Sequence, residues 1–303
     1  MSTTTPETLV SWTDVQDIEL AIVRRMHEYM AGAHASVFQG SGFDFVGLRD
    51  WQPGDRLSAI DWSQSTLTNF SPLITREFEQ QSTARIVIIA DTSVSTRCGG
   101  RGVPIAMVIA RAVATFAMAG AFFQDQVGLI TFDGRSRHMS VRPQVGKNHA
   151  MHCLDAYQDV VLGRKHYEPQ LVENTFDGLL RKTSMAPVVS DFLFEDYESL
   201  LDELLKLQAS HDTFVVLVDC RDAYDLPVIS DGWIEAADVE TGQSRLLSSS
   251  ELEQLGDRIV GWQDTVEAAA QSRGLEVLRI SADIDAFHGA VVQFLAGRRL
   301  RKR

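Results

Sequence analysis

The sequence is poor in cysteine and contains no long uninterrupted apolar run. Its 303 residues include three cysteines, Cys98, Cys153 and Cys220, which cannot all pair with one another and lie far apart. A disulfide framework is therefore not expected, and a reduced, cytoplasmic protein is the simpler interpretation. No apolar run reaches the roughly 18 residues that a membrane span requires. The first residues also lack the basic end and the apolar stretch of a signal peptide.

Basic residues are outnumbered by acidic ones, with 28 Lys and Arg against 41 Asp and Glu and a net charge of −13. Because neutralising phosphates takes a basic face, we do not expect a general nucleic-acid binder. Residues 191–257 hold 17 acidic and 3 basic side chains, a net charge of 3 − 17 = −14. By contrast, residues 298–303 hold five basic side chains. We interpret that tail as a solvated helix end, with an anchor for acidic lipid or an acidic partner as the alternative.

Several enzyme signatures are missing as well. The sequence has no Walker lysine motif and no Gly-x-Ser-x-Gly nucleophile elbow. A phosphatase similar to the haloacid dehalogenases would need a second aspartate two residues after Asp91, where Ser93 stands instead. We therefore expect a protein that is not an enzyme.

What the sequence does contain is an alternation of apolar strands and helices, in a chain that is 45% hydrophobic. Buried strands are predicted at 85–91, 126–133, 186–191, 213–219 and 275–280, with an edge strand at 137–142. Helices are predicted at 104–123, 196–208, 250–273 and 286–299, and a hairpin at 233–247. This alternation predicts an α/β fold with a doubly wound, mostly parallel sheet covered by helices on both faces.

The part before residue 84 has a different pattern. A helix is expected to begin at Asp14 with Thr13 as its cap, and short strands are expected at 36–45, 46–51 and 73–78. The predicted organisation is a helical segment over 1–35, a small β-rich extension over 36–83 and the α/β domain over 84–303. One large domain with an extension accounts for the length better than two equal domains.

Asp91, Asp133 and Asp191 are among the acids that end the predicted strands. In an open parallel sheet, ligands bind beyond the carboxyl ends of the strands, near the point where strand order reverses. The first acid begins the pattern Asp91-x-Ser93-x-Ser95, which places three oxygen-bearing side chains on one loop. Such hard ligands suit Mg²⁺, which takes about six oxygens, whereas zinc prefers thiolate or imidazole. The alternative is that these side chains only cap a turn and backbone amides.

This loop resembles the first loop of the metal-ion-dependent adhesion site in von Willebrand factor A domains. In such sites the two serines bind the metal directly and the aspartates act mostly through water, while a threonine and an aspartate from two other loops complete the set. The resemblance assigns those two roles to Thr175, at the start of a predicted helix, and to Asp191. Thr183 and Thr131 are competing threonines. Asp133 either supports the ligands from outside or is only a polar strand end.

The segment before this loop carries a second resemblance. Leu48-Arg-Asp-Trp-Gln-Pro-Gly-Asp55, Ile60-Asp-Trp62 and Arg76-Glu-Phe-Glu79 precede the metal-loop pattern in that order. They resemble the bacterial family known as domain of unknown function 58, whose hallmarks are an Arg-x-Tyr-x-Pro-Gly-Asp turn and an Arg-x-Ile-Asp-Trp segment before a domain similar to the von Willebrand factor A domain. The clear similarity covers residues 36–95.

This sequence departs from the family pattern at three places. Trp51 stands where a tyrosine is usual, Ser58 replaces an arginine, and Thr66-Leu67 replaces an Ala-Arg pair. The loss of two arginines weakens any electrostatic role of the segment. Trp51 and Trp62 are predicted to be core residues.

A turn is predicted at Pro53-Gly54-Asp55, because proline presets φ and glycine tolerates positive φ. We expect Arg49 to pair with Asp55 or Asp61 and so hold this turn in place. The segment is interpreted as structural, with a contact to a partner as the alternative.

The resemblances imply a protein-interaction module that depends on Mg²⁺ and accepts a carboxylate from a partner. They also imply that the partner is a MoxR-type AAA+ ATPase or its client, with this chain as an adaptor in a chaperone-like system. Two alternatives remain open, a hydrolase that uses a metal on the same acidic loop and a structural A domain without metal.

Overall fold

The computed structural model describes most of the chain, and the statements below refer to those residues. They are 8–32, 44–52, 60–79, 84–100, 103–133, 136–164, 175–221, 223–224, 233–237, 244–283, 286–287, 289–291 and 294. The chain divides into two compact units. The larger comprises Met1–Met26 and Ala84–Arg303, and the smaller comprises His27–Thr83.

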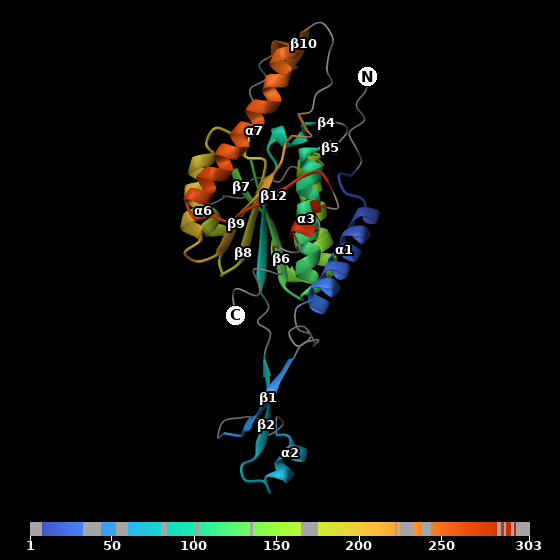
Figure 1. Cartoon of the computed structure of the whole chain (residues 1–303), viewed down its shortest axis with the longest axis vertical. Coiled ribbons are helices and arrows are strands. Elements are labelled where there is room, and N and C mark those ends of the chain that lie inside the picture. The colour runs from blue at the N-terminus through green and yellow to red at the C-terminus, as the bar shows by residue number, and fades with distance from the viewer. Residues whose placement is uncertain are drawn as a thin grey trace. The chain divides into compact units, whose positions relative to one another are not determined.

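The larger unit is built on a six-stranded sheet (Figure 1). Its strands are β3 (Arg85–Asp91), β6 (Gln126–Asp133), β7 (Ser136–Val145), β8 (Met185–Ser190), β9 (Asp212–Val218) and β12 (Val277–Ile280). They lie in the order β12-β9-β8-β3-β6-β7, and all neighbours are parallel except β6 and β7. The strand order reverses between β3 and β8. The predicted doubly wound, mostly parallel α/β fold is therefore confirmed.

Helices cover both faces of this sheet. The helices of the unit are α1 (Trp12–Gly32), α3 (Ile105–Phe122), α4 (Lys147–Val161), α5 (Phe176–Leu179), α6 (Tyr197–Leu207) and α7 (Ser249–Ser272). In Figure 1, α1 and α3 lie on one side of the sheet, and α6 and α7 lie on the other. The described residues between 286 and 294 are also helical. Short pieces complete the unit: a 3₁₀ turn at Val94–Arg97, the strands β4 (Gly99–Gly100) and β5 (Val103–Pro104), and the hairpin β10 (Trp233–Ala237) and β11 (Ser244–Ser248).

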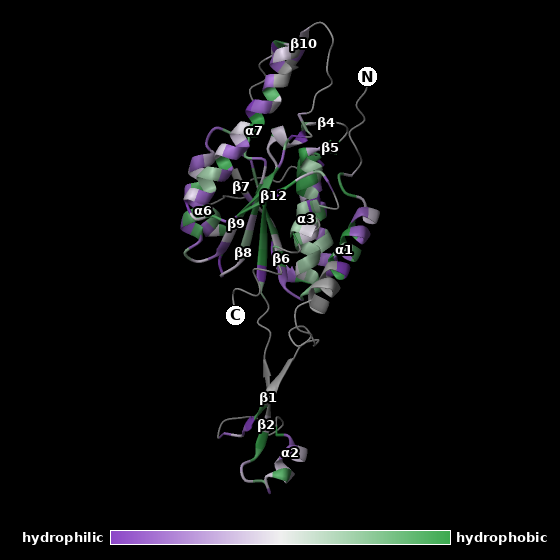
Figure 2. Ribbon diagram, in the orientation of Figure 1, coloured by the Kyte–Doolittle hydropathy of each residue, from purple (hydrophilic) through white to green (hydrophobic). Residues whose placement is uncertain are grey.

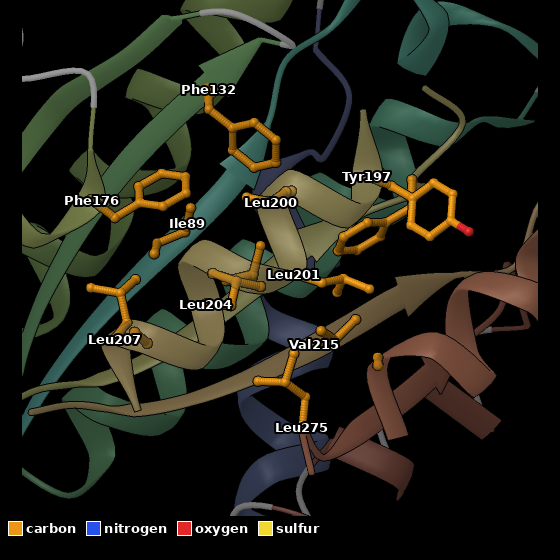
Figure 3. Packing of buried hydrophobic residues seen from close by; sticks show 14 of the residues in the cluster. Ile89, Phe132, Phe176, Tyr197, Leu200, Leu201, Leu204, Leu207, Val215 and Leu275 are labelled. Atoms are coloured by element: carbon orange, nitrogen blue, oxygen red, sulfur yellow. The ribbon is translucent and has the colours of Figure 1, made fainter. Parts of the chain in front are cut away.

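The core follows from the hydropathy of these elements, with apolar colours in the central strands and along α3 in Figure 2. By length and composition α3 could cross a membrane, yet 83% of it is buried, as in the core helix of a globular unit. On the opposite face, α6 presents a stripe spaced by three or four residues. Figure 3 shows these side chains against β3, β6 and β9: Tyr197, Leu200, Leu201, Leu204 and Leu207.

The edges of the sheet are irregular. At one edge β12 has four residues. At the other, the pairing of β7 with β6 shifts register around Gly128. Gly128 faces Pro143 of β7, and a Cβ built on it would lie 2.9 Å from the Pro143 nitrogen. Only glycine allows this close approach of the two backbones.

The smaller unit contains β1 (Asp44–Asp50), α2 (Trp62–Leu67) and β2 (Ile74–Glu79), with β1 and β2 paired antiparallel. Asp61 caps α2 by accepting from the Gln64 amide at 3.2 Å. Arg49 donates to the Asp50 carbonyl at 3.1 Å. The predicted turn with Asp55, and with it the pairing of Arg49 with Asp55, lies outside the described residues. The alternative pairing of Arg49 with Asp61 stays a prediction. Trp51 is half-buried.

Two local predictions are wrong. Trp62 was expected in the core, but its side chain is 59% exposed. The cap of α1 is Ser11 rather than Thr13, because the Ser11 hydroxyl and amide both donate to the Asp14 carboxylate at 2.7 Å. The Asp14 amide donates back to the Ser11 hydroxyl at 3.3 Å, which completes a reciprocal cap.

Candidate metal centre

The candidate site lies at the carboxyl edge of the sheet, where the strand order reverses between β3 and β8. Asp91 is the last residue of β3 and Asp191 follows the last residue of β8, and both are fully buried. A crevice forms beyond the strand ends at such a reversal, because the two flanking connections leave in opposite directions. The sheet therefore brings together two of the acids that the sequence singled out.

The first loop turns tightly after β3. The backbone amide of Thr92 extends the ladder to the Phe132 carbonyl at 2.8 Å, and the Ser93 amide then donates to the Asp91 carboxylate at 2.8 Å. The 3₁₀ turn that follows places the hydroxyls of Ser93 and Ser95 3.1 Å apart. Both serines are close to full burial, at 7% and 8% exposure. The fold therefore brings the hydroxyls of Ser93 and Ser95 together on the loop that follows Asp91.

Ser190 joins this loop to the second one. Its hydroxyl donates to the Asp91 carboxylate at 2.5 Å and accepts from the Phe192 amide at 2.9 Å. The Asp191 carboxylate in turn accepts from the Leu193 amide at 3.0 Å. Ser190 was not predicted as a functional residue, although it lies directly before the strand-end acid. Its position relative to Asp91 depends on the pairing of β3 with β8.

Thr175 stands at a third place near this edge. It is the exposed N-cap residue of α5, and its hydroxyl does not cap the helix. The next residue, Phe176, packs its ring edge-on against Phe132, with centroids 5.8 Å apart, and Phe132 is the ladder partner of Asp91. The exposed hydroxyl of Thr175 is therefore held on an element that is anchored beside the first loop.

The competing residues are placed differently. Thr131 is buried in β6, and its hydroxyl lies 3.0 Å from that of Ser140 on the neighbouring strand. Thr183 precedes the start of β8, so it lies at the amino end of that strand, whereas the strand-end acids lie at the carboxyl ends. Asp133 is exposed at the end of β6. Of the three threonines, Thr175 directly precedes Phe176, whose ring packs against Phe132 of β6.

The electrostatics at this edge are negative. The Tyr157 hydroxyl donates to the Asp91 carbonyl at 3.0 Å. Burial, and then the charges of Asp91 and Asp191, raise the pKa of Tyr157 well above its ordinary value. Burial and the Asp191 charge likewise raise the pKa of the Cys220 thiol. Two buried carboxylates are costly in a protein interior unless their charge is balanced, and a divalent cation balances both.

The donor set fits a hard cation. It consists of hydroxyls and carboxylates, the oxygen ligands that Mg²⁺ prefers. Among the described residues, no cluster of three or more His, Cys, Asp or Glu side chains is suited to hold a metal. This speaks against a site of the zinc type among those residues, whereas a site built on serine and threonine hydroxyls does not need such a cluster.

Comparisons with known proteins give a family and several distant structures. No curated protein matches the sequence. Among solved structures, the chain is similar to the conserved hypothetical protein BatB from Bacteroides thetaiotaomicron, at 12% identity and a TM-score of 0.40, covering 71% of this chain and 98% of that one. It is also similar to an aerotolerance-related membrane protein from Bacteroides fragilis, at 11% identity and a TM-score of 0.39, covering 71% and 97%. A third is the SpRpn10 VWA domain, at 14% identity and a TM-score of 0.32, covering 70% and 94%.

These similarities are low, and the fold assignment rests on the strand order of the chain itself. The family assignment is stronger, because one family profile matches residues 47–257, well over half of the chain. That range includes the Pro53-Gly54-Asp55 sequence, the Asp91-x-Ser93-x-Ser95 loop and Ser190-Asp191-Phe192. The resemblance drawn from the sequence is confirmed, and the chain belongs to the family described as protein of unknown function DUF58.

Proposed function

We propose that this chain is a non-enzymatic interaction module that binds Mg²⁺ and, through it, a carboxylate of a protein partner. The proposed direct ligands are the hydroxyls of Ser93, Ser95 and Thr175. The carboxylates of Asp91 and Asp191 are proposed to hold water molecules around the ion. When bound, Mg²⁺ supplies a positive charge with an open coordination position, to which an acidic side chain can bind.

The single observation that supports this proposal most is the pair of hydroxyls of Ser93 and Ser95, 3.1 Å apart on the loop that follows the buried Asp91. Ser190 joins the two loops, so the carboxylate of Asp91 is oriented before any ligand arrives. Ser93 and Ser95 retain slight exposure, and Val94 between them is 46% exposed. The loop therefore faces solvent, where a partner can reach it.

The charge of the chain supports a role for the cation in partner binding. Residues 191–257 carry a net charge of −14, and they begin in the second loop, at Asp191. An acidic surface repels a carboxylate, whereas a divalent cation between them reverses the interaction. The proposal thus explains how an acidic module can take an acidic ligand.

As the partner we propose a MoxR-type AAA+ ATPase or its client, with this chain as an adaptor in a chaperone-like system of the cytoplasm. The support for the partner is the family resemblance, and the support for the cytoplasm is the pair of buried free thiols, Cys153 and Cys220. Burial raises the pKa of Cys153 to about 12, so that thiol is unreactive at neutral pH.

The direct test is a calorimetric titration of the whole chain with Mg²⁺. We expect saturable binding that Ser93→Ala weakens by at least about tenfold, because a ligand is lost. Ser63→Ala, at an exposed hydroxyl of α2, is the matched control and should bind as the unmodified chain does. Unfolding in EDTA should be the same for all three, because neither substitution removes core packing.

Partner binding is tested by capture of a purified MoxR-type ATPase in Mg²⁺ and in EDTA. We expect capture in Mg²⁺ alone and its loss with Asp91→Ala. Binding that ignores EDTA and survives Asp91→Ala would refute the mechanism. Turnover of a generic phosphoester that Asp91→Ala abolishes would instead support a hydrolase, and an absence of Mg²⁺ binding would support a purely structural domain.

A further inference from the structure

Gln263 of α7 joins the ends of two strands at the candidate site. Its side chain is fully buried. Its amide nitrogen donates to the carbonyls of Asp191 at 3.0 Å and Val218 at 2.7 Å, and its amide oxygen accepts from the Cys220 amide at 3.1 Å. Each atom of the amide thus meets a partner of the opposite hydrogen-bonding type. A helix that is distant in sequence therefore fixes the backbone that bears the second acid.

The neighbouring residue, Trp262, holds the next carbonyl of the same loop. Its indole N–H donates to the Phe192 carbonyl at 2.9 Å. Its ring packs edge-on against Tyr197 of α6, with centroids 5.2 Å apart. The two consecutive carbonyls of Asp191 and Phe192 are therefore both bound by consecutive side chains of α7.

Phe192 needs such support because its backbone is left-handed, with φ of 55°. A bulky side chain rarely adopts this conformation, which persists only where the surroundings hold it. Here the Phe192 amide donates to Ser190 and its carbonyl accepts from Trp262, while its ring is buried and stacked on Phe194. The strained turn sits between the acid of the second loop and the helix that restrains it.

The same turn reaches the first loop. The Ser190 hydroxyl that accepts from the Phe192 amide also donates to the Asp91 carboxylate. A continuous set of hydrogen bonds therefore runs from α7 through the Phe192 turn to Ser190 and Asp91. A shift of the turn would change the position of Asp191 and would loosen the contact of Ser190 with Asp91.

We propose that Trp262 and Gln263 are positioning residues of the metal site, which hold the Asp191 loop in the geometry that binds the ion. This inference rests on the proposed function, since it concerns the same Mg²⁺ site. Neither side chain is proposed as a ligand. Supporting residues of this kind commonly change metal affinity by roughly 10- to 100-fold when they are replaced.

The decisive variant is Trp262→Phe, which removes the indole N–H and keeps an aromatic ring against Tyr197. We expect calorimetry to show Mg²⁺ binding weakened by about tenfold, with the unfolding midpoint in EDTA changed little. The matched control is Trp233→Phe on β10, where the side chain is 67% exposed, and its Mg²⁺ affinity should equal that of the unmodified chain. Equal affinity in Trp262→Phe and the unmodified chain would overturn the inference.

A second measurement uses the unmodified chain and so does not depend on whether a variant folds. Because coupling between sites is reciprocal, Mg²⁺ should also act on Trp262. In a nitrogen–proton correlation spectrum of the unmodified chain, saturating Mg²⁺ should move the indole signal of Trp262 and leave that of Trp233 in place. An unmoved Trp262 signal despite calorimetric Mg²⁺ binding would refute the positioning role alone. No Mg²⁺ binding by the unmodified chain would refute the proposed function and this inference together.

Discussion

The two units of the chain stabilise themselves in different ways. In the larger unit, the sheet is covered on both faces, and its buried side chains are overwhelmingly apolar. In the described part of the smaller unit, the buried side chains are Ile60, Asp61, Ser65 and Thr75, three of them polar. The described part, a two-stranded ribbon with one six-residue helix, has too few layers to enclose a core. That part of the smaller unit therefore depends on hydrogen bonds, whereas the larger unit depends on packing.

Three large apolar side chains of the smaller unit lie at its surface. Trp62, Leu67 and Phe70 are 59%, 78% and 53% exposed. Large apolar residues left at a surface contribute little to folding, because they lose little contact with water. Substitutions that are matched in chemistry should therefore have very different effects in the two units.

The largest difference is expected between two leucines. Leu201→Ala on α6 removes a fully buried side chain and should lower the free energy of unfolding by about 2–5 kcal/mol. Leu67→Ala on α2 should change it by less than about 0.5 kcal/mol. Urea unfolding with an unchanged slope measures both values. A comparable loss in the two variants would show that the smaller unit has a core of its own.

Two phenylalanines with the same backbone strain sharpen the comparison. Phe192 and Phe70 have φ of 55° and 60°, but Phe192 is fully buried and Phe70 is half exposed. Glycine relieves the left-handed strain, worth roughly 1–2 kcal/mol, while loss of a buried ring costs about 3 kcal/mol or more. Phe192→Gly should therefore destabilise by about 2 kcal/mol, and Phe70→Gly should be neutral or slightly stabilising. Thermal unfolding of the two variants measures both effects. A fall of the unfolding midpoint in both variants, or a rise in both, would contradict this expectation.

The smallest effect is expected at a hydrogen bond of the smaller unit. The fully buried Ser65 hydroxyl donates to the Asp61 carbonyl at 2.8 Å and accepts from the Ile74 amide at 2.8 Å. Ser65→Ala leaves the Ile74 amide unsatisfied, at a cost of about 1–2 kcal/mol. Amide hydrogen exchange should become faster in β2 and stay unchanged in β3. Faster exchange in both strands would mean that the two units unfold together.

The sequence predicted most of the larger unit and less of the smaller one. Both outcomes depend on how much of each unit is buried. Buried parallel strands appear as continuous apolar runs, so β3 and β8 were visible with their terminal acids. Trp62, which is exposed, was predicted to lie in the core, because the residue type alone does not reveal how few neighbouring groups cover its side chain. Ser11 was missed as a helix cap because Thr13 also offered a suitable hydroxyl.

At the candidate site, the sequence identified what lies within one loop and missed what joins loops. Asp91, Ser93 and Ser95 form a local pattern and were found by their spacing. The contact of Gln263 with the Asp191 carbonyl joins residues 72 positions apart, so no local signal marks it. In the sequence Gln263 stands between Val260 and Val266 at helical spacing, and this becomes meaningful only when the helix is placed against the sheet.

The irregular outer strands of the six-stranded sheet, β12 and β7, affect whether two copies of this protein can associate by strand addition. An incoming strand needs a straight row of free amides and carbonyls. At one rim β12 offers four residues, and at the other β7 carries Pro143, which has no amide hydrogen, beside a register shift. Strand addition between molecules is therefore disfavoured at both rims, which protects a chain with a long apolar sheet from amyloid-like growth.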